Sequence, residues 1–463
     1  MSGMPPNLSF FMSRLQGFST SYAKVEPQGP TEGSAGKIVR FALPSNSYLM
    51  LNSCKILCNV ELSAGTAAQA RMPAKMTSFV DRVAVYVGGV MIQNGYSGYN
   101  VLSHGLSALK GKSNDDSLQG HPEMVRATSY HTGTALSGAE SYTNRGQQLC
   151  ISLENTFLST AAPSCFDTGL VGQIVVELVL ADDAVCASID GTGMYKATDD
   201  GGTVGKVGAK DTKFKLTNMS LQCEIAGFAS SVVDALVEST IANTGYISVP
   251  FKQFFTFTNS HSLTSRWSVN SASWDAVYFM WRNKNYSTQA GFHPVPGYKI
   301  AGGPAATITG TPDIGVPSGV DEGGVLNSNQ EKYVSPYFRF QEELQSGVTH
   351  GEYQLQINGA SVPSFRMTSS DFLRISLNSV SSHHIHNTMT MKQYRDSFFV
   401  QAMRFSLPDS DIFRVASGLD TRSVSANCAI ETPGVASDAN LTIVCECTSE
   451  LRVGASRAIE CIN

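Results

Sequence analysis

The sequence predicts an all-β protein built from two similar antiparallel sandwiches with a few short helices. Short runs rich in β-branched and aromatic residues dominate the chain, and clusters of glycine, asparagine, aspartate, serine and proline separate them. The order of features in the first half also recurs in the second. At 463 residues, with 42% hydrophobic and 15% charged residues, the chain is long enough for two or three domains with real cores.

A β-hairpin followed by a helix is predicted in FVDRVAVYVGGVMIQNGYSGYNVLSHG, residues 79–105. Two apolar runs of period two flank Gly88 and Gly89, and glycine readily adopts the positive φ angles of a two-residue hairpin turn. From Tyr99 to Leu109 the apolar residues recur every three or four positions, which predicts a short helix. A second hairpin is predicted in GEYQLQINGASVPSF, where an Asn-Gly pair separates two alternating segments.

Further strands and one further helix are predicted from the same patterns. The predicted strands cover residues 36–43, 47–62, 171–180, 212–225, 277–282, 353–357, 371–377, 397–407 and 440–453. The predicted helix covers SSVVDALVESTIANTG, residues 230–245, with an apolar face and a glycine just beyond its end.

An internal duplication is indicated by the features on either side of this mid-chain helix. Residues 246–258 match the character of 37–49, DAVYFMWRN matches KILCNVELS, and the hairpin returns at 351–365. A chance likeness between two unrelated β domains is the alternative. The expected domains are an N-terminal arm (1–35), a first sandwich (36–229), a connecting helix (230–245) and a second sandwich (246–463).

The N-terminal segment and three long inserts are expected to reach outside the sandwiches. The first twenty residues have an apolar patch without a basic region before it, which favours an ordered arm or short helix over a secretory signal. No apolar run approaches the length that spans a bilayer. The polar, glycine-rich inserts at 111–146, 182–211 and 283–332 are expected to form the outer surface and to carry recognition.

Charge and cysteine content narrow the function classes. A net charge of −5 gives no whole-chain attraction for nucleic acid, so sequence-specific nucleic-acid binding is not expected. The ten cysteines lie mostly inside apolar strand-like runs. Buried free thiols in a reducing compartment are therefore favoured over a disulfide scaffold, and no pair has the companion ligands of a tetrahedral zinc site.

Motifs that carry chemistry are nearly absent. The segment GGTVGKV lacks the spacing of a phosphate-binding loop, and Gly454-Ala455-Ser456 is not a nucleophile elbow. The run SSHHIHN is interpreted as a solvated loop or subunit contact rather than a metal site. Three adjacent carboxylate pairs are interpreted as solvated surface: Asp182-Asp183, Asp199-Asp200 and Glu342-Glu343. The prediction is a protein that is not an enzyme, with no catalytic, cofactor-binding or metal-binding residues.

Several segments together resemble double jelly-roll major capsid proteins of eukaryotic DNA viruses, of the polinton-like virus and virophage type. They keep their order along most of the chain: LPSNSYLMLNSCKILCNVEL, FVDRVAVYVGGVMIQNGYSGYNVL, EYQLQINGASVP, DTRSVSANCAIETPG and CECTSELRVGASRAIECI. The resemblance implies two tandem eight-stranded jelly rolls. It also implies a homotrimeric, pseudo-hexagonal capsomer that tiles the icosahedral shell of a virion.

The partners implied by the resemblance are neighbouring capsomers, penton and minor capsid proteins. An internal membrane is a further candidate partner, reached through the N-terminal arm. Two alternatives remain open at the level of sequence. One is a trimeric viral spike, fibre or lectin-like glycan-binding protein, and the other is a carbohydrate-active enzyme with two converging carboxylates.

Overall fold

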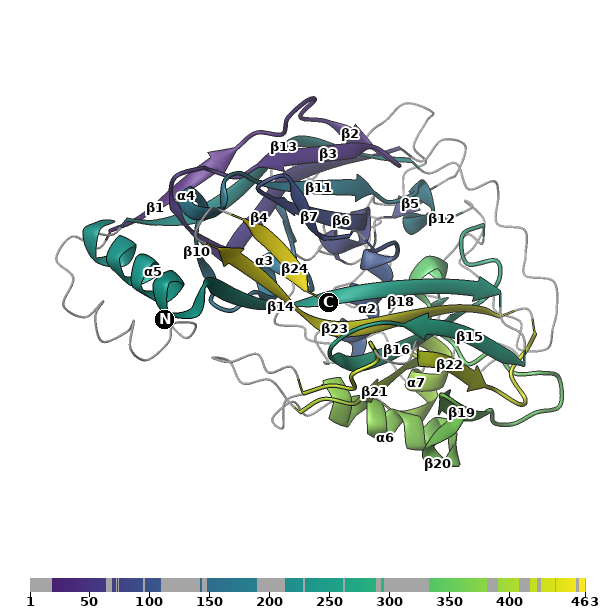
Figure 1. Cartoon of the computed structure of the whole chain (residues 1–463). Coiled ribbons are helices and arrows are strands. Elements are labelled where there is room, and N and C mark those ends of the chain that lie inside the picture. The colour runs from purple at the N-terminus through teal and green to yellow at the C-terminus, as the bar shows by residue number, and fades with distance from the viewer. Residues whose placement is uncertain are drawn as a thin grey trace.

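The computed structural model shows two β-sandwiches, one from each half of the chain (Figure 1). It describes residues 19–63, 69–71, 73, 75–94, 96–109, 142–143, 148–189, 213–227, 230–260, 263–288, 293–294, 333–380, 390–407, 417–422, 426–437, 439–454 and 458–462.

The first sandwich consists of two facing antiparallel sheets. One has the order β1-β13-β4-β10 and the other the order β3-β11-β6-β7. The strands are β1 (Ser19–Val25), β3 (Ile38–Ala42), β4 (Tyr48–Ser63), β6 (Val80–Val87), β7 (Val90–Gln93), β10 (Cys165–Asp167), β11 (Ile174–Leu180) and β13 (Lys213–Gly227). The shorter strands β8 (Tyr142–Thr143) and β9 (Leu149–Ser152) also pair with β4, and β2 (Gly33–Ser34) pairs with β13. A small ribbon joins β5 (Gln69–Arg71) to β12 (Ala187–Ile189).

The second sandwich repeats this arrangement. Its sheets have the orders β14-β23-β16-β21 and β15-β22-β19-β20. The strands are β14 (Tyr246–Ser260), β15 (Thr264–Val269), β16 (Trp274–Arg282), β19 (Glu352–Ile357), β20 (Ala360–Thr368), β21 (Val400–Arg404), β22 (Ala426–Glu431) and β23 (Asn440–Gly454). The last strand, β24 (Ile459–Ile462), pairs with β23, and β17 (His293–Pro294) pairs with β18 (Tyr333–Val334).

Both sandwiches have the same topology. When the eight main strands of each are numbered along the chain, one sheet reads 1-8-3-6 and the other 2-7-4-5, in both halves. This is the strand order of a jelly roll, in which two Greek keys fold into facing sheets. The predicted fold class, two tandem antiparallel jelly rolls, is confirmed.

One predicted equivalence between the halves is wrong. Strand β14 holds the first position of its sandwich, so its counterpart is β1 (19–25) and not the segment 37–49. The sequence STSYAKV has no clear apolar alternation because β1 is an exposed edge strand, held by seven-residue pairing with β13. We therefore propose that the first sandwich begins at residue 19, with the remaining boundaries at 230 and 246. Residues 1–18 of the expected arm lie outside the described residues.

The two predicted hairpins and the helix after the first hairpin are confirmed. Gly88 and Gly89 have φ angles of 57° and 85°, and Asn358 and Gly359 have 52° and 81°. Both central residues of each turn are thus left-handed, as a type I′ turn requires. Helix α2 (Tyr99–Leu109) follows β7 directly, and α5 (Ser230–Thr244) forms where the connecting helix was predicted.

The strand predicted at 371–377 is instead part of helix α6 (Ser369–Val380). Thr368 and Asp371 form a reciprocal cap at its start: the Thr368 backbone N–H donates to the Asp371 carboxylate, and the Asp371 N–H donates to the Thr368 hydroxyl. Phe372, Ser376 and Ser379 are buried on one helical face. The apolar alternation in DFLRISL fits a strand as well as a helix. The cap at Thr368 and Asp371 stabilises the helix.

Short helices complete the fold. They are η1 (Met76–Phe79), α3 (Phe157–Thr160), α4 (Thr168–Val171), η5 (Asp183–Val185), η7 (Pro336–Phe338) and α7 (Met391–Ser397). In the described part of the chain, no helix combines the length and the apolar character needed to cross a membrane.

The ten cysteines are free, and most of them are buried in the sheets. Burial raises the pKa of Cys428 and Cys447 to about 12. At neutral pH these thiols are therefore protonated and behave as small apolar side chains, as the sequence predicted.

Candidate functional site

The candidate functional feature is the contact between the two sandwiches, which we call the junction. It consists of the outer face of the β14-β23-β16-β21 sheet and the parts of the first sandwich that cover it: the segment around Tyr96, helix α2 and helix α3. All nine residues of β16 are buried, although neighbouring side chains on a strand point to opposite faces. This sheet is therefore covered on both sides.

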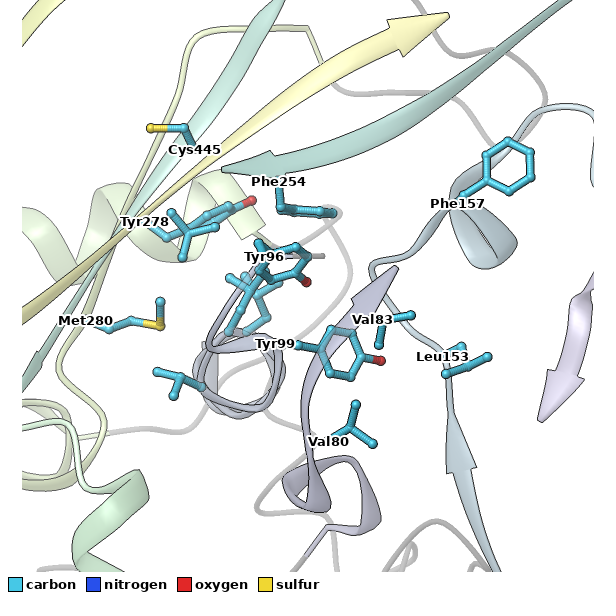
Figure 2. Close-up of a cluster of buried hydrophobic side chains, with 14 of the residues drawn as sticks. Val80, Val83, Tyr96, Tyr99, Leu153, Phe157, Phe254, Tyr278, Met280 and Cys445 are labelled. Atoms are coloured by element: carbon cyan, nitrogen blue, oxygen red, sulfur yellow. The ribbon is translucent and has the colours of Figure 1, made fainter. Parts of the chain in front are cut away.

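Aromatic and apolar side chains form the centre of the junction (Figure 2). The rings of Tyr96 and Phe254 lie 5.3 Å apart, and Tyr278 and Met280 extend from the same sheet face toward the first sandwich. In Figure 2 Cys445 points away from Tyr278, and it lies near Cys428 of β22 in the other sheet of the second sandwich. Without the first sandwich, the second sandwich would expose these large side chains to water.

Gly105 allows helix α2 to lie close to the second sandwich. A Cβ atom at this position would lie 3.2 Å from both the Met280 sulfur and a Val400 methyl group. Glycine in a helix interior costs about 1 kcal/mol relative to alanine, so its presence here is explained by this approach. This glycine, inside an otherwise helical pattern, is a sequence signal that could have indicated the close contact.

A buried polar cluster lies beside the aromatic centre. Lys252 Nζ is 2.9 Å from Asp275 Oδ2 and donates to Thr448 Oγ1 at 2.9 Å, and the two charged side chains are only 4% and 2% exposed. A second carboxylate, Glu446, lies 3.9 Å from the same ammonium and accepts a hydrogen bond from the Tyr278 hydroxyl at 2.5 Å. Burial, and then the Glu446 charge, raises the pKa of Tyr278.

The first sandwich closes over this cluster. The Lys252 backbone N–H donates to the Thr160 hydroxyl at 3.1 Å, and the Ala162 N–H donates to the Pro250 carbonyl at 3.0 Å. The charged groups are buried because the two sandwiches pack together. Breaking the junction would hydrate them again, so the cluster ties the orientation of the two halves to the burial of an ion pair.

His104 of α2 forms a further contact across the junction. Its ring stacks on Phe338 of η7 with the ring centres 3.9 Å apart and the planes 14° from parallel. Nε2 is hydrogen-bonded to the Ser78 hydroxyl. Burial, and then the Lys75 charge, lowers the pKa of His104 well below its usual value. The imidazole is therefore neutral in the folded protein at neutral pH.

The C-terminal strand reaches back to the first hairpin. Ile459 of β24 fills the space beside Gly88, where an added Cβ would lie 2.6 Å from the Ile459 side chain. The Cys461 thiol points at the Ile92 carbonyl at 3.8 Å. Strand β24 thus connects the second sandwich to the hairpin β6-β7 of the first.

Two of the carboxylate pairs are described, and both have structural roles. Asp182 accepts from the Ala184 N–H at 2.8 Å and begins η5, while Asp183 accepts from the Phe214 N–H at 3.1 Å. The interpretation of Glu342 as solvated surface is wrong. Its side chain is 2% exposed and forms an ion pair with Arg395.

The other candidate segments lie outside the described residues. These are Asp199-Asp200, 201–207, 381–387, 455–456 and most of the long inserts. Among the described residues, no group of three or more histidine, cysteine, aspartate or glutamate side chains is arranged to hold a metal ion. The prediction of no catalytic, cofactor-binding or metal-binding residues stays a prediction.

The fold also occurs in solved virus capsid structures. A chain of the quasi-atomic model of the PBCV-1 virus capsid superimposes with a TM-score of 0.55 at 12% identity, covering 97% of this chain and 98% of the other. The chain has the fold of this PBCV-1 capsid chain. PBCV-1 VP54, in a crystal structure fitted into a reconstruction of the virophage Sputnik, gives 0.53 at 13% identity with the same coverage. No family model matches the chain, and no curated protein matches it in sequence.

The junction was missed at the level of sequence, although the sequence contains a signal for it. Within WDAVYFMWR the six residues AVYFMW, 276–281, form an apolar run without polar alternation, which is typical of a strand buried on both faces. In its counterpart KILCNVEL of β4 the inward positions are all apolar, whereas three of the four outward positions are polar, as in a strand covered on one face; the outward positions are Lys55, Leu57, Asn59 and Glu61.

Proposed function

We propose that the chain is the major capsid protein of a DNA virus, a structural building block and not an enzyme. The observation that supports this proposal best is the end-to-end likeness to the PBCV-1 capsid chain, which covers both sandwiches and the junction and not one sandwich alone. A shared fold by itself does not establish a function. The duplicated jelly roll, however, is a shape suited to building walls of repeated units.

The proposed assembly unit is a homotrimer. Three copies of a chain with two similar sandwiches place six sandwiches around one axis, giving a pseudo-hexagonal capsomer that can tile an icosahedral shell. The proposed partners are neighbouring capsomers, penton and minor capsid proteins, and an internal membrane contacted by residues 1–18. The proposed location is the virion shell, after synthesis in a reducing compartment of the host cell, where the ten free thiols would persist.

The test is the mass and shape of the purified chain. Light scattering coupled to size-exclusion chromatography should give three times the chain mass, and negative-stain electron microscopy should show particles with a hexagonal outline. An elongated particle without a hexagonal outline would support the spike or fibre alternative. A monodisperse monomer at micromolar concentration would contradict the capsomer proposal.

A further inference from the structure

We infer that the outer face of the β1-β13-β4 sheet binds a second copy of the chain through that copy's unit β19-β20-α6. This inference rests on the proposed homotrimer and names the surfaces that join its subunits. We call the first surface the sheet face and the second the hairpin-helix unit.

The junction inside one chain supplies the pattern. There, helix α2 and the segment around Tyr96, which follow the hairpin β6-β7, cover the outer face of the 1-8-3-6 sheet of the second sandwich. Because both sandwiches have the same strand order, the first sandwich has the same kind of sheet. For the same reason, the second sandwich has the same hairpin followed by a helix. One such pair of surfaces is used within the chain, and one pair is left over.

Burial shows that the sheet face is accessible in a single chain. Strand β16 is buried at every residue, whereas its counterpart β4 has half-buried outward residues, among them Met50, Leu57 and Asn59. Strand β1 is mostly exposed, and the Tyr22 side chain is 69% exposed. Large apolar side chains at accessible positions on a sheet are typical of surfaces that meet a partner.

The hairpin-helix unit is accessible as well. Phe365 on the edge strand β20 is 54% exposed, and Arg374 and Asn378 are exposed on α6, with Leu373 and Leu377 half-buried beside them. An edge strand with an exposed aromatic side chain is a template for contact with another chain unless it is covered.

The position of these two surfaces excludes their meeting within one chain. In Figure 1 the strands β1 and β13 lie at the top of the molecule, and β20 and α6 lie at the bottom, on the side of the second sandwich far from the first. Only another copy can bring a hairpin-helix unit to the sheet face. Such a contact joins two different surfaces, and repeating it leads to a closed ring or a filament. With two sandwiches per chain and a junction inside each, a ring of three copies alternates internal and external junctions.

The internal junction buries larger apolar side chains than the sheet face presents, as expected for a contact that forms within one chain. The internal junction buries Phe254, Tyr278 and Met280, and these side chains are not exposed to water in the folded chain. The sheet face mixes Leu57 with polar Asn59 and is compatible with a chain that folds before it assembles.

The experiment places one negative charge on each surface. Leu57→Glu changes the sheet face and Phe365→Glu changes the hairpin-helix unit, and Leu263→Glu is a matched control at an exposed apolar position outside both surfaces and outside the junction. Light scattering should show a trimer for wild type and for Leu263→Glu. Both surface variants should raise the concentration at half-assembly by at least about tenfold. Tyr22→Glu, on the exposed edge strand, repeats the sheet-face test without touching the core.

Mixing the two variants tests the pairing itself. A Leu57→Glu chain keeps its hairpin-helix unit and a Phe365→Glu chain keeps its sheet face, so the mixture should form a heterodimer and no trimer. Monomers alone in the mixture would overturn the inference. The inference would also be overturned if Tyr22→Glu and Phe365→Glu, each tested alone, formed trimers at the same concentration as wild type. That result would leave the capsomer proposal intact. A wild-type chain that does not form a trimer would contradict the proposed function itself.

Discussion

Replacing Lys252 by methionine should be among the most destabilising single changes in the second sandwich. The ammonium lies 2.9 Å from the Asp275 carboxylate, and both side chains are almost fully buried. At an effective dielectric constant of about 20, their attraction is about 6 kcal/mol. Removing the lysine leaves the carboxylate with hydroxyl donors from Ser273 and Thr448 and no positive charge beside it. We expect a loss of about 3–5 kcal/mol in the free energy of unfolding.

Tryptophan fluorescence during urea unfolding measures this loss, because all three tryptophans lie in the second sandwich. Adding Asp275→Asn to Lys252→Met should recover a large part of the stability, since the double variant no longer buries an uncompensated charge. Arg422→Met removes an exposed ion pair with Asp420 and should leave the unfolding midpoint unchanged. A loss below about 1 kcal/mol for Lys252→Met would refute the reasoning.

Three further results are expected. Acidification below about pH 6.5 should lower the melting temperature of wild type more than that of His104→Gln, because the unfolded chain takes up a proton that the buried, low-pKa imidazole refuses. Gly359→Ala meets no neighbouring atom and should cost about 1–2 kcal/mol of backbone strain, whereas Gly88→Ala, which also meets a backbone oxygen at 2.6 Å, should cost more in the same melting assay. The isolated segment 246–463 should aggregate or bind a hydrophobic dye, because it exposes the junction face.

The parts of the fold that could be predicted from the sequence are those with a local physical cause. The Gly88-Gly89 and Asn358-Gly359 pairs specify type I′ turns because few other residues accept two successive left-handed conformations. Apolar spacing specifies α2 because one helical face must be buried. These elements need no knowledge of their neighbours, and they are also the ones that indicated a duplication.

The errors have causes that act over longer distances. Strand β1 has little apolar pattern because its stability comes from backbone pairing with β13, about two hundred positions along the chain. The sequence of helix α6 fits the apolar pattern of a strand as well as that of a helix. The cap formed by Thr368 and Asp371 favours the helix. Glu342 looks like surface in an adjacent carboxylate pair, but Arg395, Tyr353 and Gly351 surround it in the fold.

The junction lies between these two cases. The apolar run at 276–281 of β16 indicates that both faces of its sheet are covered, but it does not identify the covering element, because helix α2 is more than 160 positions earlier. Strand β4 occupies the same place in the first sandwich, yet it keeps the alternation of a strand with one polar face. The two sheets share one strand order, so this difference in sequence reflects a difference in what each sheet meets. A face that is covered within the chain can carry large apolar side chains such as Phe254 and Tyr278 beside a buried ion pair, whereas a face that meets another chain must first be compatible with water.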